Sequence, residues 1–526
     1  MSTPSGSQKS ALADDYTGYA VITAQWLLTF GFVAATTYVV SLQAGNAHKP
    51  YTVLGDCTYW GRRTWFFCRW FQDSMNLLIE GYHKFSKRNE KWSTWVFDDL
   101  FHVLPPSMLN ELKGFSPDKL NFSRIVQDQF NWHFYMGDTL TDREYVAIVQ
   151  KHLVANLPHM TELLSEIIEK AFARHLDPPS DSRGWKTVVL WDDILDVCYD
   201  VVGESLLGEL GASSEYLHHA KSFTETVAVW SGGMHILPGW LRRLYFQLSP
   251  GGRKIRHHLS ECKRLVFPEL DRLQNEKCYE KQPSRSSVAQ GFLKHTMHNG
   301  ESNNYDEIVH QMLIVTFAAA PMWNMILNQV IQNHIAFPEH HSALTAEVQN
   351  ALRLHGGWNK AALLDMPRLE SFTRETLRST PPIMFTVQRK VMQPTQLSDG
   401  TLLKPGEKLM IPTEAILHDP TVYHKPETFD PERFYDAETN TAKSLVVTQT
   451  SEFPVFGYGN QTCPGRYFAS LATKLAFAQL LVGYEVKFFP HRLGKPVDWP
   501  ISATLMPNMD TFVAFRKREG AEFGTV

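Results

Sequence analysis

A single cysteine stands in a constrained stretch near the end of the chain, FPVFGYGNQTCPGRYF, at residues 453–468. Pro464 can begin a helix without losing a needed N–H bond, which would put Cys463 at the N-terminal end of that helix. Backbone N–H groups and the positive end of the helix dipole favour a thiolate at such a position. The spacing therefore predicts an activated thiol rather than an ordinary buried cysteine.

The residues around Cys463 predict what the sulfur would bind. Gly457 and Gly459 permit tight turns, and Gly465 leaves room for a large flat group beside the backbone. Phe456 can shield the sulfur from water. A shielded thiolate beside an open flat space is typical of an axial ligand of haem iron, which can push electron density onto the metal.

This stretch resembles the haem-binding loop of the cytochrome P450 family, Phe-x-x-Gly-x-x-x-Cys-x-Gly. The matching residues are Phe456, Gly459, Cys463 and Gly465. The resemblance extends from the N-terminal apolar segment to the last helix, and it implies haem b (iron protoporphyrin IX) with Cys463 as the axial ligand.

Two further motifs occur in the family's order. The stretch ETLR supplies Glu375 and Arg378 on one helical face, and PERF supplies Arg433. A carboxylate between two guanidinium groups can lock a helix to a loop through bidentate bonds. The resemblance implies that these three residues are structural and do not act as acid–base catalysts.

The two propionates of haem need basic or donor groups. The resemblance implies that Arg389 meets one of them. Gln461 stands where the family usually has Arg or His, and it can donate a hydrogen bond but adds no charge. Lys151 and His152, on an earlier expected helix, are further candidates.

A long apolar helix is predicted over YDEIVHQMLIVTFAAAPMWNMILNQVI. In the family the matching helix crosses the distal face of the haem and carries Ala/Gly-Gly-x-Asp/Glu-Thr, whose acid and alcohol help to deliver protons. The corresponding residues here are Ala318, Ala319, Ala320, Pro321 and Met322. Proline and methionine therefore replace the acid and the alcohol.

This departure has two expected consequences. Pro321 removes an N–H and crowds the carbonyl of Phe317, so a kink is predicted there. The usual side-chain proton relay is absent. Thr316, Asn324 or a substrate hydroxyl could order a water instead, and the alternative for Asn324 is an ordinary polar contact in the core.

An anchor is predicted at the start of the chain. Residues 16–47 contain no Asp, Glu, Lys, Arg or His, and the apolar part of this segment is long enough to cross a bilayer. A cleaved signal peptide would need a more basic start. We therefore expect a short tail at 1–15, a transmembrane anchor at 16–42, a linker at 43–60 and a catalytic domain at 61–526. Basic residues that follow the anchor favour a cytoplasmic catalytic domain. The resemblance implies a single-pass position in the membrane of the endoplasmic reticulum.

The rest of the chain predicts a mainly α fold with a minor β part. Helical patterns dominate before Pro381, and short β-favouring runs broken by turn residues follow it. The segment 235–254 is apolar and basic, which fits either membrane contact or an ordinary helix connection. The net charge of −4 gives no argument for nucleic acid as a partner, and the cysteine spacing supports neither disulfides nor a zinc site.

Three functions remain open at this stage. The first is a membrane-anchored haem-thiolate monooxygenase that uses O₂ and electrons from NADPH–cytochrome P450 reductase, with cytochrome b5 as a further donor. Its substrate would be a hydrophobic secondary metabolite such as a terpenoid, polyketide or alkaloid, held by 130–137, Ala319, Ala320 and 382–387. The second is a haem-thiolate isomerase or dehydratase, which can lack the acid–alcohol pair. The third is a non-catalytic haem sensor or electron carrier.

Overall fold

In the computed structural model, the described residues are 51–54, 62–97, 99–137, 143–150, 155–178, 184–208, 211–235, 237, 239–275, 287–298, 304–492 and 494–519. The predicted tail (1–15) and anchor (16–42) lie outside the described residues. Of the predicted linker, only 51–54 is described. Lys151 and His152 also lie outside the described part of the chain.

Helices dominate the fold. Up to residue 298 they are α2 (Arg62–Lys84), α3 (Leu109–Leu112), α4 (Ser123–Phe130), α5 (Arg143–Val149), α6 (Ala155–His175), α7 (Leu190–Leu207), α8 (Ser214–Met234), α9 (Gly239–Leu248), α10 (Pro250–Asn275) and α11 (Ser287–His298). They continue with α12 (Tyr305–Ala336), α13 (His341–His355), α14 (Lys360–Leu364), α15 (Pro367–Ser379), α16 (Thr413–Leu417) and α17 (Arg466–Gly483). Short 3-10 turns lie at Ser86–Arg88, Pro106–Met108, Trp132–Phe134, Pro338–His340 and Gly459–Gln461.

The strands form small sheets. The largest has the order β1 (Trp92–Val96), β2 (Asp99–Val103), β8 (Lys408–Ile411), β5 (Thr386–Val391) and β3 (Leu120–Asn121). A second has the order β11 (Tyr484–Phe488), β14 (Phe512–Lys517) and β4 (Lys186–Val189). Two-stranded pairs join β9 (Tyr435–Asp436) to β10 (Thr441–Ala442), β12 (Trp499–Ile501) to β13 (Thr504–Met506), and β6 (Thr395–Gln396) to β7 (Leu402–Leu403). The β2–β8 pairing is parallel, with Phe101 opposite Lys408, and the others are antiparallel. The predicted mainly α fold with a minor β part is confirmed.

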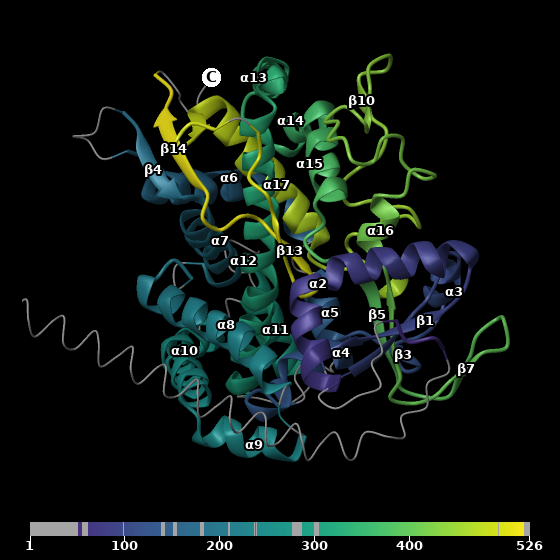
Figure 1. The fold of residues 1–526 in the computed structure, drawn as a ribbon. Helices are drawn as coiled ribbons and strands as arrows, with labels where there is room; N and C mark the ends of the chain where they lie inside the picture. The colour runs from purple at the N-terminus through teal and green to yellow at the C-terminus, as the bar shows by residue number, and fades with distance from the viewer. Residues whose placement is uncertain are drawn as a thin grey trace, which may run out of the picture.

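The long helix α12 forms the centre of the fold (Figure 1). Asn304 caps it by accepting a hydrogen bond from the Glu307 N–H, and Asp306 and Glu307 complement the positive end of the helix dipole. Within the described residues it is the one helix long and apolar enough to span a membrane, but most of it is buried inside the protein. It packs against α7, α15 and α17. Helix α12 is therefore a core element, and it packs directly against α15, which carries Glu375 and Arg378, and against α17, which follows Cys463.

Candidate functional site

The loop that precedes α17 turns through two glycines in the left-handed region. Gly457 and Gly459 have φ angles of +82° and +80°, which L side chains rarely adopt. A Cβ on Gly459 would also lie 2.4 Å from the Cβ of Lys113, so a side chain has no room there. The Cys463 N–H then donates to the Phe456 carbonyl at 2.8 Å. Together these features fix Cys463 just before α17.

The thiol of Cys463 combines accessibility with desolvation. Its side chain is exposed, yet burial among protein atoms raises the pKa of the thiol. Both observations fit a sulfur at the wall of an internal space. A Cβ on Gly465 would meet only the Cys463 Sγ, at 3.9 Å. There is accordingly room for a flat group beside the sulfur.

Two expectations about this end of α17 need correction. The helix begins at Arg466, with Gly465 as its N-cap, and not at Pro464. Desolvation also outweighs the backbone N–H groups of Gly465 and Arg466, so the pKa of Cys463 is raised rather than lowered. The loop alone does not make a thiolate. A bound metal ion would, because a coordinating thiol is deprotonated.

The three residues of the expected lock lie together. Both nitrogens of one Arg378 edge donate to Glu375, Nε to Oε2 at 2.7 Å and Nη2 to Oε1 at 2.9 Å. Arg433 Nε donates to Glu375 Oε2 at 2.9 Å. The Asp430 N–H donates to Oε1 at 2.9 Å. Glu375 and Arg378 are fully buried, so α15 carries a desolvated carboxylate that is completely surrounded by donors.

The guanidinium groups of this lock hold distant backbone. Arg378 Nη1 donates to the Leu417 carbonyl at the end of α16 at 2.9 Å. Arg433 Nη1 donates to the His424 carbonyl at 2.6 Å, and its Nη2 donates to the Thr428 carbonyl at 2.9 Å. These bonds tie α15, α16 and the segment between α16 and β9 into one unit.

The cysteine loop has its own attachments. Gln449 Oε1 accepts from the Phe456 N–H at 2.8 Å, and Thr386 Oγ1 on β5 donates to the Pro454 carbonyl at 2.9 Å. Tyr458 Oη donates to Asn110 Oδ1 at 2.9 Å. The loop is thus fastened to β5 and to α3.

Arg389 on β5 is a buried cation that lacks an anion. It is 2% exposed, and burial lowers its pKa to about 10. Its Nη groups donate only to the carbonyls of Gln388 and Tyr458, and its Nε has no partner. No carboxylate in the described part of the chain pairs with it. A buried guanidinium left in this state is costly, so the site fits a group that brings its own carboxylates, as haem b does.

Gln461 has a different place from the one expected. Its Nε2 donates to the Leu120 carbonyl at 2.7 Å, and its Oε1 accepts from the Phe122 N–H at 2.9 Å. Both ends of the amide therefore bind the backbone between β3 and α4. Gln461 therefore holds the cysteine loop, and its contact with a propionate stays a prediction. Sequence spacing could not reveal this, because the partner lies 341 residues away.

Accessible residues along α12 are concentrated in its middle. Phe317, Ala319, Pro321 and Met322 are partly accessible and Ala318 is exposed, whereas nearly all of the flanking turns are buried. Ala320 is buried. The helix is continuous across Pro321, so the expected kink does not interrupt it. The accessible stretch of α12 therefore coincides with the residues that were matched to the distal motif.

A row of buried amides continues from this stretch towards the end of α12. Asn324, Asn328 and Gln332 are fully buried and four residues apart, which puts them on one side of the helix. Asn328 Nδ2 donates to Asn324 Oδ1 at 2.8 Å. Asn324 Nδ2, Asn328 Oδ1 and both polar atoms of Gln332 have no partner among the described residues. Thr316, the other residue considered for water, donates to the Met312 carbonyl.

The spacing of this amide row was visible in the sequence, yet only Asn324 was singled out there. Unpartnered buried polar atoms are rare in proteins and are commonly satisfied by ordered water. The amide row therefore fits a buried water site.

The expected pocket wall at 130–137 packs against α12. The ring of Phe317 contacts Phe130 and Trp132 edge-on, with centroid distances of 4.8 and 5.0 Å. Trp132 and Tyr135 also contact Phe223 on α8. In the other expected wall, 382–387, every residue except Ile383 is buried. Aromatic rings thus border the accessible part of α12.

Helix α9 presents apolar side chains to solvent. Trp240, Leu244 and Leu248 are four residues apart and are 74%, 50% and 66% exposed. Beside this helix lies a cleft of about 520 Å³, lined by His133, Phe134, Arg243, Phe246, Gln247 and Arg256. The exposed stripe fits contact with an apolar surface better than it fits solvent.

The family model described as Cytochrome P450 matches residues 149–512. The relative named cytochrome P450 monooxygenase verB, from Clonostachys rogersoniana, is 28% identical over 89% of this chain and 93% of its own length. The relative named cytochrome P450 monooxygenase sirB, from Leptosphaeria maculans, is 30% identical over 84% of this chain and 86% of its own length. The ent-kaurene oxidase of Gibberella intermedia is 25% identical over 95% of this chain and 94% of its own length.

Among solved structures, retinoic acid bound cyanobacterial CYP120A1 superposes with a TM-score of 0.64 at 16% identity. The match covers 85% of this chain and 95% of that chain. At this identity the likeness concerns the fold alone.

Proposed function

This chain belongs to the cytochrome P450 family, and we propose that it oxidises a hydrophobic secondary metabolite with O₂ and electrons from NADPH–cytochrome P450 reductase. It is an oxidoreductase of the monooxygenase type, and haem b is its cofactor. The observation that carries the proposal is the accessible but desolvated Cys463, in a loop fastened to the β5 strand that also bears the unpaired Arg389.

In this proposal Cys463 holds the iron and Arg389 meets a propionate of the haem. Gly465 leaves room for the ring, and Phe456 keeps water from the sulfur. Haem b, when bound, supplies the redox-active iron and the electron transfer by which O₂ is activated. The lock of Glu375, Arg378 and Arg433 holds the framework without taking part in the reaction.

The distal side supplies protons through water in this proposal. The side chains of Pro321 and Met322, at the positions of the usual acid and alcohol, carry no exchangeable proton. The amide row on α12 starts one turn beyond Ala320 and has polar atoms without a partner among the described residues, whereas the Thr316 hydroxyl one turn before Ala320 is bonded to the Met312 carbonyl. Amides can hold a chain of waters by donating and accepting hydrogen bonds. We assign Asn324 and Asn328 this positioning role.

The substrate class follows from the pocket wall and from the relatives. The aromatic rings beside α12 favour an apolar molecule that is bound mainly by its shape. The name ent-kaurene oxidase gives ent-kaurene as the substrate of that relative. A terpenoid, polyketide or alkaloid fits the same type of wall.

Membrane attachment and electron supply complete the proposal. Residues 16–42 anchor the chain in the endoplasmic reticulum with the catalytic domain in the cytoplasm, and the exposed stripe of α9 rests on the same membrane. NADPH–cytochrome P450 reductase, with cytochrome b5 as a further donor, supplies electrons from that surface.

One observation favours a second function. Since Pro321 and Met322 replace the acid and the alcohol, a haem-thiolate isomerase or dehydratase is the alternative. Turnover of candidate metabolites by the reconstituted protein separates the two. A monooxygenase requires reductase, NADPH and O₂, and it incorporates one atom of labelled O₂ into each hydroxylated or epoxidised product. Conversion that continues without NADPH and O₂ would contradict the proposal and support the alternative.

A further inference from the structure

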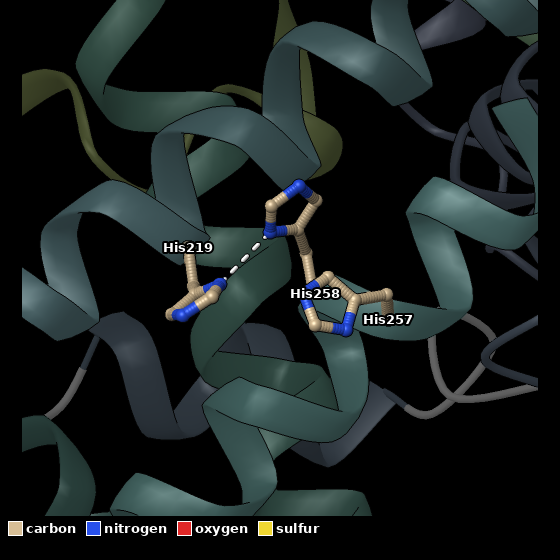
Figure 2. Close-up of side chains that lie close together, drawn as sticks. All are labelled: His219, His257 and His258. Carbon is tan, nitrogen blue, oxygen red and sulfur yellow. Dashed lines mark hydrogen bonds between the residues drawn. The ribbon is translucent and has the colours of Figure 1, made fainter.

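Four histidines gather where α8 packs against α10, and no part of the haem site uses them. His218 and His219 lie on α8, and His257 and His258 lie on α10. Figure 2 shows the rings of His219 and His258 turned toward each other across the helix pair, with Nδ1 atoms 2.9 Å apart. The His257 ring centroid lies 5.8 Å from that of His219 and 5.1 Å from that of His258.

Three of these rings offer nitrogen ligands at suitable distances. One nitrogen from each of His219, His257 and His258 lies within 4.8 Å of the other two. In a tetrahedral zinc site with Zn–N bonds of about 2.0 Å, ligand nitrogens lie about 3.3 Å apart. The Nδ1 pair needs to open by a few tenths of an ångström, and the third ring needs to move closer. We propose that His219, His257 and His258 bind a divalent zinc ion.

The environment of the rings suits a metal. His258 is buried, His219 is partly buried and His257 is exposed, so the cluster is reachable from solvent on one side. Desolvation and the neighbouring imidazoles lower the pKa of His219 and, to about 4, that of His258. Neutral imidazole is the form that zinc binds. Because the contact between the two Nδ1 atoms at 2.9 Å is a hydrogen bond, one ring must move its proton from Nδ1 to Nε2 before both Nδ1 atoms can bind zinc.

Two carboxylates lie next to the cluster. Glu215 and Glu261 are each four residues from a cluster histidine on their own helix, and both also lie within 4.8 Å of His219. Arg264 holds both of them, with its Nε donating to Glu261 Oε2 at 2.7 Å. Because Arg264 already binds both carboxylates, the fourth zinc ligand is water. Glu261 can take that place only by giving up its hydrogen bond to Arg264.

A zinc ion here would cross-link α8 to α10. Phe223 lies one turn beyond His219 on α8 and contacts Trp132 and Tyr135 of the aromatic wall. Trp132 in turn contacts Phe317 on α12. Fixing α8 would therefore restrain one wall of the proposed substrate pocket.

The test uses the full-length, untagged holoenzyme, stripped with a chelator and then dialysed against buffer containing zinc. Elemental analysis should find one zinc per haem iron. His219→Gln should weaken zinc binding at least about tenfold, in line with the loss of one of three ligands. The triple variant His219→Gln/His257→Gln/His258→Gln should bind none, and His340→Gln, a histidine outside the cluster, should bind as the parent does.

Hydrogen exchange gives a second measurement that does not depend on activity. Zinc should slow amide exchange in 214–234 and 250–275 of the parent and leave the triple variant unchanged. An unaltered carbon monoxide spectrum would show that the triple variant is folded. Absence of zinc from the parent, or equal zinc in the parent and the triple variant, would overturn the proposal.

Discussion

Two buried polar clusters of this protein are built in opposite ways. Around Glu375 each carboxylate oxygen accepts two hydrogen bonds, from Arg378, Arg433 and the Asp430 N–H. Along α12 the amides of Asn324 and Asn328 bind each other and leave polar atoms without a partner among the described residues. In the Glu375 cluster protein atoms satisfy every hydrogen bond of the carboxylate. In the amide row some polar atoms are left for water to satisfy.

The difference follows from the cost of burying each group. A buried charge without compensation costs several kcal/mol, whereas a buried amide can be satisfied by a single water. The carboxylate of Glu375 can therefore be buried only inside a complete set of donors, which makes the lock rigid. The amide row tolerates exchangeable partners. We infer that the first cluster serves structure and the second serves hydration.

The largest expected effect is that of Cys463→Ala. If this thiol is the haem ligand, the variant should lose the haem-thiolate spectrum with carbon monoxide, and product formation should fall to background. Cys198→Ala, which removes another unpaired thiol from the core helix α7, is the matched control and should keep both. A normal spectrum in Cys463→Ala would refute the assignment of the ligand.

Glu375→Ala should be the most destabilising change that leaves the ligand in place. It strands two guanidinium groups, so the free energy of unfolding should fall by about 3–5 kcal/mol. Glu432→Ala is the control, because Glu432 pairs with Arg368 where both side chains are partly exposed. An exposed pair contributes about 0–1 kcal/mol. Urea denaturation followed by haem release measures both, and equal losses would contradict the distinction between buried and exposed pairs.

The sequence could predict a cluster where the interacting residues belong to one short motif or to motifs of the same family pattern. Glu375 and Arg378 are three residues apart on one helix, so their meeting follows from helix geometry, and Arg433 was placed beside them by the resemblance. The central apolar helix and the short strands after Pro381 were likewise predictable from periodicity and turn residues. The joining of β5 and β8 with the early strands β1, β2 and β3 in one sheet was not. The N-terminal anchor and the roles assigned to site residues remain predictions.

Other features depend on tertiary contacts that no spacing reveals. Gln461 binds the backbone at Leu120 and Phe122, and Arg389 is buried without an anion. The raised pKa of Cys463 could not be foreseen, because the opposing effects of desolvation and backbone N–H groups depend on atomic packing. The histidine cluster was missed as well, since its two pairs meet only when α8 and α10 pack together.

Asn328→Leu tests the proposed role of the amide row in holding water. The leucine fills a similar volume and removes an Oδ1 that has no partner, but it also removes the Nδ2 that donates to Asn324 Oδ1 and to the Asn324 carbonyl. The free energy of unfolding should therefore fall by about 1–2 kcal/mol. Product formed per NADPH should nevertheless fall about threefold to tenfold, a modest share of the 10²–10⁴-fold usual for positioned proton transfer. Product and NADPH are measured together in the reconstituted system.

Asn333→Leu is the control for this prediction. Asn333 lies on the same helix, but its amide donates to Thr376 Oγ1 at 3.2 Å. Its replacement should lower stability by about 1 kcal/mol and leave the coupling of NADPH to product unchanged. If both variants uncouple equally, the amide row has no special role.

The smallest effect concerns the edge of the lock, where His418 follows the Leu417 carbonyl that Arg378 holds. Burial opposes the charged form of His418, but the hydrogen bond and charge of Glu414 outweigh it and raise the pKa. A raised folded-state pKa stabilises the protein below the unfolded value of about 6.5, and this stabilisation is lost as pH rises through the folded value. His418→Gln should therefore flatten the fall of the melting temperature from pH 6 to pH 8. Glu414→Gln should flatten it as well, and an undiminished slope in both variants would show that the pair does not contribute.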